Sequence, residues 1–159
     1  FGFKEARGEF LLMMDADYSH RAEDLPPFLE AINQDRVGLV IGSRGLGGSA
    51  EFTLVRTLGN VFLTAILNSF FKLKLTDCLN GYKMFRREVF DHFSYHAKTF
   101  EIEIEIIANA LRAGYGVVEV PAHERARAGG RAKSKPIRHG TRFLLQILKE
   151  GLKWRLFHR

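Results

Sequence analysis

Three segments of the chain have the apolar composition of strands, and the first two are predicted to be buried by helices on both faces. Residues Phe10–Met14 and Val37–Ile41 are unbroken apolar runs, and Val117–Pro121 is a similar run that contains one glutamate and ends in proline. Such runs are typical of parallel sheets, in which both faces are buried. A helical stripe between the first two runs consists of Leu25, Phe28, Leu29 and Ile32. This part of the chain is therefore predicted to form a strand–helix–strand unit with a parallel strand pair.

Residues Phe52–Phe71 are apolar around most of a helix circumference. One polar line crosses the segment at four-residue spacing and consists of Arg56, Asn60, Thr64 and Asn68. A helix of this kind is either buried in a core or lies at a membrane interface. The polar line argues against a segment that spans the bilayer.

Residues 100–113 fit two patterns. Glutamate and isoleucine alternate with the period of a strand, but a set of apolar residues also shares one helical face, and Gly114 follows as a stop. We predict a helix because the segment is longer than an average strand. Glu101, Glu103 and Glu105 are then expected on a solvated face.

Two further elements are predicted. Tyr82–Phe85 is expected to be a short strand. A basic C-terminal helix is predicted within residues 136–159, and one face of its stretch 137–157 carries Leu144, Leu145, Leu148 and Leu152.

Composition narrows the class of protein. A length of 159 residues with 46% hydrophobic residues suits one globular domain, and the single cysteine, Cys78, excludes an internal disulfide framework. The chain starts at Phe1 without an initiator methionine, so we expect an internal start. The net charge is +6, and residues 125–159 hold eleven Lys/Arg against one acid, Glu150. This asymmetry predicts an anionic partner: a phosphate-bearing substrate, lipid headgroups or nucleic acid.

Two carboxylates, in Asp15-Ala16-Asp17, follow the first predicted strand directly. Ligands of open α/β sheets gather at the carboxyl ends of strands, and two acids there can hold a divalent cation that in turn holds phosphate. The alternative is that one aspartate forms a turn or caps a helix.

Other polar clusters also stand at the ends of elements. Ser43 and Arg44 precede a glycine-rich loop, Asp77 precedes Lys83, and a basic loop runs from Arg125 and Arg127 through Lys135. Acids suit a cation, whereas arginine, serine and glycine suit phosphate oxygens. The mixture is what an enzyme acting on a nucleotide diphosphate needs.

The order and spacing of these motifs resemble family-2 glycosyltransferases, most closely the dolichol- or polyprenyl-phosphate mannosyl- and glucosyltransferases. The resemblance extends from about residue 8 to the end of the chain. It is carried by Asp15–His20 with Leu25-Pro26, Val40–Arg44, Arg56 with Asn60, Thr76-Asp77 with Gly81–Lys83, Glu105, Glu119–Pro121, Arg127, Gly129-Gly130 and Ser134-Lys135.

This resemblance implies a GT-A-like α/β fold, with a mostly parallel sheet flanked by helices. Residues 1–159 would be the C-terminal two-thirds of one such domain, and the first strand–helix–strand portion, with the nucleotide-base pocket, would lie upstream of residue 1. Residues 52–71 would be a candidate interfacial helix.

The resemblance also implies roles for individual residues. Asp15 and Asp17 would bind Mg²⁺ or Mn²⁺ on the donor diphosphate, with Ser19 where some members use glutamine as a further ligand. The roles implied for the other positions are donor binding by Arg127 and Lys135, acceptor-phosphate binding by Ser43, Arg44, Arg56 and Asn60, and catalysis by Asp17, Asp77 and Arg127. The family's loop often reads Gly-Glu-Ser-Lys, whereas this chain has Gly130-Arg-Ala-Lys-Ser-Lys135.

The implied activity is metal-dependent, inverting transfer of mannose or glucose from GDP-mannose or UDP-glucose to a polyprenyl or dolichyl phosphate. The enzyme would be peripheral on the cytoplasmic face of a membrane. A phosphate acceptor is already anionic and needs no general base.

Two other functions stay open. A family-2 transferase with a glycan hydroxyl acceptor would need a base, for which Asp77 is the candidate. A nucleic-acid-binding module would use residues 125–159, but aromatic side chains are not interleaved with its cations, so we expect no nucleic acid partner.

Overall fold

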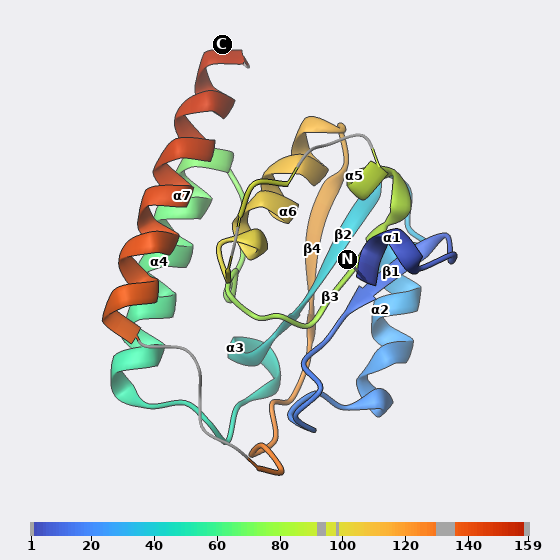
Figure 1. Cartoon of the computed structure of the whole chain (residues 1–159), viewed down its shortest axis with the longest axis vertical. Helices are drawn as coiled ribbons and strands as arrows, with labels where there is room; N and C mark the ends of the chain where they lie inside the picture. Colours follow the sequence, from blue (N-terminus) through green and yellow to red (C-terminus); the bar gives the residue numbers. More distant parts are fainter. Residues whose placement is uncertain (1, 92–94, 98, 130–135, 158–159) are drawn as a thin grey trace.

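A four-stranded sheet with helices on both faces forms the centre of the computed structural model, which describes residues 2–91, 95–97, 99–129 and 136–157 (Figure 1). The elements in chain order are α1 (Gly2–Glu5), β1 (Phe10–Met13), a 3₁₀ turn (Ala22–Asp24), α2 (Leu25–Ile32), β2 (Val37–Ser43), α3 (Arg44–Gly47), α4 (Leu54–Phe71), β3 (Lys83–Arg86), α5 (Arg87–Asp91), α6 (Ile102–Arg112), β4 (Gly116–Pro121) and α7 (Pro136–Phe157).

The strand order in the sheet is β1-β3-β2-β4. β3 pairs antiparallel with both β1 and β2, and β2 pairs parallel with β4, so three of the four described strands share one direction. The predicted α/β class, with helices flanking the sheet, is confirmed. The predicted direct pairing of the first two strands is wrong, because β3 lies between them. An apolar run shows that a strand is buried but does not identify its neighbours.

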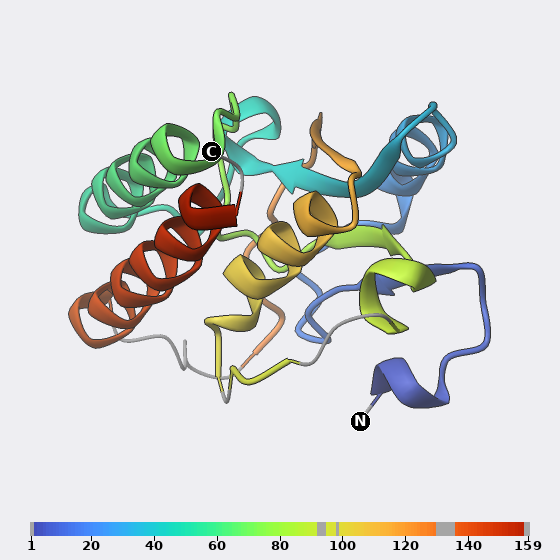
Figure 2. The ribbon, with the colours of Figure 1, turned by 90° about the horizontal axis from the view of Figure 1, so that it is seen from above.

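The two faces of the sheet are covered by different helices (Figure 2). α2 covers one face with Phe28 and Ile32, which are fully buried, whereas Leu29 of the predicted stripe is 46% exposed. α6 covers the other face, and α7 packs against α6 and α4. The larger core lies on this second side, around Ile107 and Ile147.

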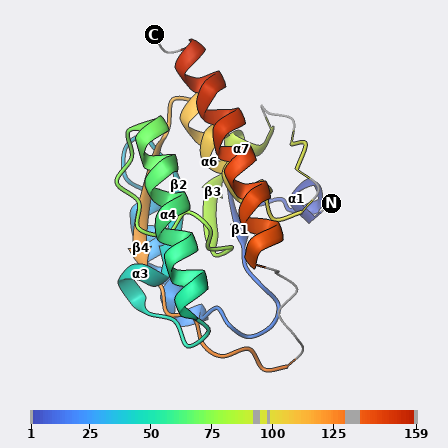
Figure 3. The same ribbon diagram turned by 90° about the vertical axis from the view of Figure 1, so that its left-hand side faces the viewer.

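α4 and α7 run side by side in the same direction (Figure 3). They approach closely at Gly151, where a Cβ atom would lie 2.4 Å from the Phe70 ring. The predicted polar line of α4 faces inward, because Asn60 and Thr64 are buried. This pair of helices forms one wall of the cavity described below.

Both helices also expose apolar side chains. On α4 these are Leu54, Val55, Leu58, Val61 and Phe62, and on α7 they are Ile137, Leu145, Leu148, Leu152 and Leu156. Three of the four leucines predicted on one face of the last helix are therefore exposed, while Phe143 and Ile147 enter the core. Among the described residues, α4 alone has the length and composition to cross a membrane, a criterion that core helices of soluble proteins also meet.

Candidate active site

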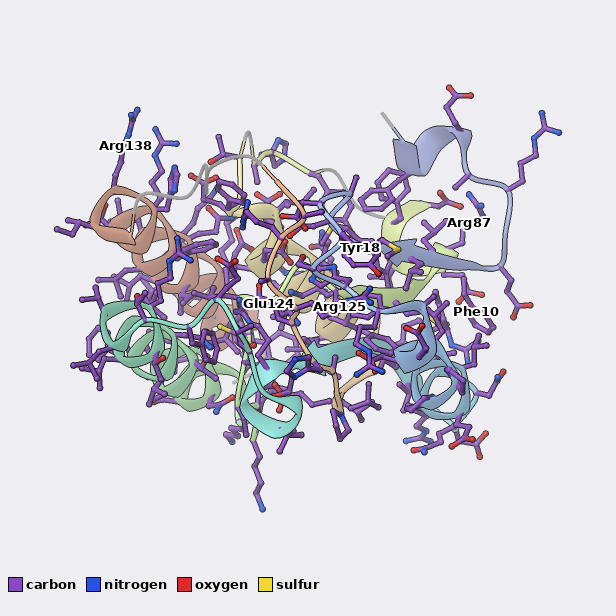
Figure 4. The ribbon with its side chains drawn as sticks, turned by 90° about the horizontal axis from the view of Figure 1, so that it is seen from below. Phe10, Tyr18, Arg87, Glu124, Arg125 and Arg138 are labelled. Atoms are coloured by element: carbon purple, nitrogen blue, oxygen red, sulfur yellow. The ribbon has the colours of Figure 1, made fainter. Side chains whose placement is uncertain are left out.

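A cavity of about 700 Å³ lies where the loop after β1 meets the first turns of α4 and α7. Its polar lining includes Asp15, Asp17, Arg44, Glu51, Arg56, Asn60, Glu103, Glu124 and Arg127, and its apolar lining includes Val55, Leu63, Phe100 and Phe143. Figure 4 shows this end of the molecule, with Tyr18, Glu124 and Arg125 near its centre and Arg138 at its edge. The structure thus brings together residues from four of the motifs in the sequence.

The loop that carries the two aspartates is held by its own side chains. The Asp15 backbone N–H donates to His20 Nδ1 at 3.0 Å, and the His20 ring stacks on Tyr82. Burial lowers the pKa of His20, which favours the neutral ring whose Nδ1 accepts this bond. Tyr18 has a φ of 73°, the left-handed conformation that turns the chain sharply here.

Asp17 is oriented by Ser19 and paired with an arginine. Asp17 Oδ1 accepts from the Ser19 hydroxyl at 2.6 Å and from the Ser19 backbone N–H at 3.1 Å. The Ser19 hydroxyl, followed by its backbone N–H and the Arg127 charge, lowers the pKa of Asp17, although burial opposes the shift. Ser19 is buried and does not line the cavity, and its hydroxyl is engaged by Asp17, so in this structure it orients Asp17. Its role as a further metal ligand stays a prediction.

The basic loop is fastened to the aspartate turn. Arg127 Nη1 lies 3.2 Å from Asp17 Oδ2, and the Ala128 N–H donates to the Asp17 carbonyl at 3.0 Å. The Arg125 guanidinium lies over the Tyr18 ring, 3.9 Å from its centroid. Arg127 also approaches Glu51, whose Oε1 accepts from the Arg127 backbone N–H. Lys135, the other predicted cation of this loop, lies outside the described residues.

Arg44, which lines the cavity, forms a buried ion pair with Asp77. Arg44 Nε donates to Asp77 Oδ2 at 2.6 Å, Arg44 Nη2 donates to Oδ1 at 2.9 Å, and Asn60 Nδ2 donates to Oδ1 at 2.8 Å. Burial works to raise the pKa of Asp77, but the hydrogen bonds and charge of Arg44 outweigh it and lower that pKa. Asp77 is fully buried and absent from the cavity lining, so it contacts the site only through Arg44 and Asn60.

The segment that carries Asp77 is held in place by hydrogen bonds to β4. Glu119 of β4 accepts from the backbone N–H groups of Thr76 and Asp77, both at 2.7 Å. Ser43 Oγ and Thr76 Oγ1 are 2.6 Å apart, and Ser43 is fully buried. Ser43 thus supports the turn from which Arg44 projects and does not line the cavity, and its role at the acceptor phosphate stays a prediction.

Close backbone contact places that turn beside the end of β4. A Cβ atom at Gly47 would lie 2.4 Å from the backbone of Ala122, so only glycine allows α3 to approach this closely. Arg44 Nη1 then reaches Glu124 Oε1 at 3.5 Å, and the Arg44 guanidinium lies over the Phe52 ring at 4.9 Å.

Arg56 has fewer constraints than Arg44. Its Nη1 donates to the Glu51 carbonyl at 3.4 Å and lies 4.0 Å from Glu51 Oε2. Its side chain lines the cavity and is 30% exposed, against 15% for Arg44, so Arg56 is the more accessible of the two predicted phosphate-binding arginines.

Lys83 and Glu103 form a second buried ion pair that the sequence did not reveal. Lys83 Nζ lies 2.5 Å from Glu103 Oε2, and the lysine side chain is fully buried. The expectation that Glu103 and Glu105 face solvent is wrong, since both are buried. Glu105, which carried part of the resemblance, instead accepts from the backbone N–H groups of His96 and Ala97, and only Glu103 lines the cavity. Lys83 and Glu103 lie 20 positions apart on different elements, so no local sequence pattern indicates that they pair.

Comparison with known proteins identifies the family. A model described as "Glycosyl transferase family 2" matches residues 1–93. The chain belongs to this family. The predicted recognition as a glycosyltransferase of family 2 is thereby confirmed.

Three curated relatives of this family-2 chain are named as mannosyl- or hexosyltransferases, and two of the names include a polyprenyl phosphate. The chain is 29% identical to the undecaprenyl-phosphate mannosyltransferase of Micrococcus luteus, over 93% of this chain and 65% of the relative. It is 32% identical to the dolichol-phosphate mannosyltransferase of Pyrococcus furiosus, over 93% of this chain and 43% of the relative. It is also 28% identical to the low-salt glycan biosynthesis hexosyltransferase Agl6 of Haloferax volcanii, over 81% of this chain and 32% of the relative. The chain thus spans from about a third to about two-thirds of the length of these relatives.

Solved structures confirm the fold class. Glucosyl-3-phosphoglycerate synthase from Mycobacterium tuberculosis, in complex with Mn²⁺, uridine diphosphate and phosphoglyceric acid, matches with a TM-score of 0.71 at 15% identity, over 94% of this chain and 51% of that chain. A mycobacterial protein matches with a TM-score of 0.72 at 18% identity, over 94% of this chain and 49% of that chain. The family-2 chain therefore has a GT-A-like α/β fold.

The aspartate turn suits a divalent cation that phosphate oxygens help to bind. Asp15 and Asp17 both line the cavity, and the Arg127 guanidinium on Asp17 shows that a positive charge is accommodated there. Among the described residues, no group of three or more His, Cys, Asp or Glu could hold a metal. Two carboxylates leave coordination positions for phosphate and water, which is how Mg²⁺ is usually bound beside a substrate.

Proposed function

We propose that this chain belongs to an enzyme that transfers a hexose, mannose or glucose, from a nucleotide sugar to a polyprenyl or dolichyl phosphate. One observation carries the proposal: a single cavity is lined by two carboxylates, Asp15 and Asp17, and by two arginines, Arg44 and Arg56. A donor diphosphate and an acceptor phosphate would each have a complementary partner. The names of the relatives from Micrococcus luteus and Pyrococcus furiosus support the same substrates.

The donor would bind at the aspartate turn. Asp15 and Asp17 would hold Mg²⁺ or Mn²⁺, which when bound would neutralise the diphosphate and its developing charge. The Arg127 guanidinium lies 3.2 Å from Asp17 Oδ2. When the cation binds Asp17, the guanidinium would leave this carboxylate and pair with the diphosphate beside it. In that position Arg127 would stabilise the departing nucleoside diphosphate, which supports the catalytic role predicted for it.

The acceptor phosphate would bind at Arg44 and Arg56, with Asn60 on the same wall. It would attack the anomeric carbon directly, in one displacement with inversion, because an ionised phosphate oxygen needs no base. The arginines would offset the repulsion between the two phosphate-bearing substrates. Asp77 would act by fixing Arg44, since both of its oxygens accept hydrogen bonds from Arg44 or Asn60.

The position of Asp77 bears on the alternative with a glycan hydroxyl acceptor. That reaction needs a carboxylate that can take a proton in the cavity. Asp77 is fully buried behind Arg44, and its pKa is lowered, so it is a poor base. The geometry therefore favours the phosphate acceptor over the hydroxyl acceptor.

The exposed apolar side chains of α4 and α7 suit a membrane surface. Leu58 of α4 and Leu152 of α7 are both more than half exposed, and Lys149 and Lys153 lie on the same C-terminal helix. Apolar side chains beside cations favour an interface with anionic lipid. We therefore propose a peripheral location on the cytoplasmic face of a membrane, where a lipid-bound phosphate would reach the cavity beside these helices.

A transfer assay with the full-length protein tests the proposal. GDP-mannose and UDP-glucose would each be offered with a short-chain polyprenyl phosphate or with a water-soluble glycan, with Mn²⁺ or with excess EDTA. The expected product is a glycosylated polyprenyl phosphate that forms only with free divalent cation. Transfer to the glycan alone would favour the hydroxyl acceptor, and full activity in EDTA would overturn the metal role.

A further inference from the structure

The hexose must lie between the two ends of the cavity if the proposed function holds. Three glutamates line the cavity, and both carboxylate oxygens of Glu51 and of Glu124 already have recorded partners. The remaining one, Glu103, is the candidate for this interval. It lines the cavity, and its carboxylate interacts electrostatically with Asp15 at the donor end and with Arg44 at the acceptor end. Glu103 therefore lies within electrostatic range of the residues that would hold the donor and of those that would hold the acceptor.

The Glu103 carboxylate is anchored by one oxygen only. Oε2 lies 2.5 Å from Lys83 Nζ, and this lysine also donates to the carbonyl oxygens of Cys78 and Asn80. No donor among the described residues is recorded for Oε1. A lysine held by three acceptors fixes the rotamer of Glu103, so that its second oxygen is held in place before a ligand arrives.

A glycine keeps the space beside this oxygen open. A Cβ atom at Gly81 would lie 3.5 Å from Glu103 Oε1 and 3.8 Å from both carboxylate oxygens of Asp15. Both carboxylates therefore border the same small volume, and Gly81 leaves it free. A purely structural ion pair would explain the burial of Lys83 and Glu103, but it would not require an open volume beside Oε1.

We propose that Glu103 accepts hydrogen bonds from hydroxyl groups of the transferred hexose and is a specificity-determining residue for the sugar. This inference rests on the proposed function, because it assigns the sugar part of the donor to a position between the two phosphate sites. A fixed, desolvated carboxylate distinguishes hydroxyl positions well, because a misplaced hydroxyl leaves the charged oxygen without a partner.

The test compares how much the sugar and the nucleotide each contribute to the affinity for the donor. The dissociation constants of the full-length protein with Mn²⁺ would be measured by calorimetry for GDP-mannose, GDP, UDP-glucose and UDP. With the nucleotide that binds, Glu103→Gln should weaken the nucleotide sugar about ten- to a hundredfold and leave the nucleoside diphosphate unchanged. Glu105→Gln is the matched control: it is another buried glutamate on α6 that does not line the cavity, and it should change neither constant.

A second variant does not disturb the ion pair. In Gly81→Ala the added methyl group would fill the space between the two carboxylates at ordinary contact distances, and it should also weaken the nucleotide sugar selectively. An equal loss for sugar nucleotide and nucleoside diphosphate, or no loss in either variant, would overturn the role of Glu103. Failure of the wild-type protein to bind any of the four ligands would instead overturn the proposed function, and the role of Glu103 with it.

Discussion

The two ends of the cavity are built differently. At the donor end, Asp17 and Arg127 each keep about a quarter of their side-chain surface exposed, and their ion pair joins two loops. At the acceptor end, Asp77 is fully buried, Arg44 is 15% exposed, and Glu119 and Asn60 complete the network. Exposed pairs contribute little to stability, whereas breaking a buried pair leaves an uncompensated charge. The donor end can thus exchange partners at low cost, while the acceptor end is part of the folded framework.

Asp17→Ala should reduce activity more than substitutions at Asp77, Arg127 or Arg56. Loss of a carboxylate that holds the cation and diphosphate should reduce transfer by about a thousandfold or more. The free energy of unfolding should fall by only about 1–2 kcal/mol, because the lost ion pair is partly exposed and the main loss is the acceptor of the Ser19 hydroxyl and N–H. Transfer assays and urea denaturation of the same preparation measure both quantities. Full activity in this variant would contradict the metal-binding role of Asp17.

Asp77→Asn should show the opposite pattern, with the main effect on stability. Removing one partner of the buried pair should cost about 3–5 kcal/mol in the free energy of unfolding, measured by urea denaturation. Asp35→Asn, at an exposed aspartate between α2 and β2, is the matched control and should be nearly neutral. A loss as small as that of the control would show that the Arg44–Asp77 pair is not part of the framework.

The pH dependence of stability should follow the same carboxylate. The pKa of Asp77 in the folded protein is lowered from its ordinary value of 3.8, so its contribution to stability is present above about pH 4 and is lost as the pH falls through the lowered pKa. The difference in unfolding free energy between wild type and Asp77→Asn should therefore shrink below pH 4. Denaturation curves at several pH values test this, and a constant difference down to the lowest pH would contradict it.

The sequence predicted the helices and strands better than it predicted which of them are neighbours in the fold. Continuous apolar runs located β1 and β2, and the helical faces located α4, α6 and α7, because burial imposes a local period. The insertion of β3 between β1 and β2 was missed, because no local pattern records which strands are neighbours.

The candidate site shows the same limit. Asp15, Asp17 and Arg127 were predicted from a motif and do line one cavity. The roles of Glu103 and Ser43 depend on contacts with residues 20 and 33 positions away in the chain, respectively. Such contacts arise from tertiary packing, which buries a glutamate that was expected in solvent and places Ser43 behind Arg44 instead of on the cavity wall.

Arg127→Met should have a smaller effect, confined to the donor end. Without the guanidinium, the Asp17 carboxylate should bind Mn²⁺ alone more tightly, by no more than about tenfold, because an exposed pair contributes only about 1 kcal/mol. The affinity for nucleoside diphosphate should fall, because Arg127 would no longer contact its phosphates. Electron paramagnetic resonance of free Mn²⁺, with and without nucleotide, measures both. Weaker Mn²⁺ binding in the absence of nucleotide would show that Arg127 supports the aspartate turn instead of competing at it.

The central claim is that one cavity has a donor end and an acceptor end with separate residues. The most direct test is the acceptor KM of Arg56→Met, since Arg56 lines the cavity and, apart from Glu51, no described residue is recorded as its side-chain ion-pair partner. We expect the KM for polyprenyl phosphate to rise about tenfold or more, while the KM for nucleotide sugar and the Mn²⁺ requirement stay unchanged. An equal rise in both KM values, or a normal acceptor KM, would contradict it.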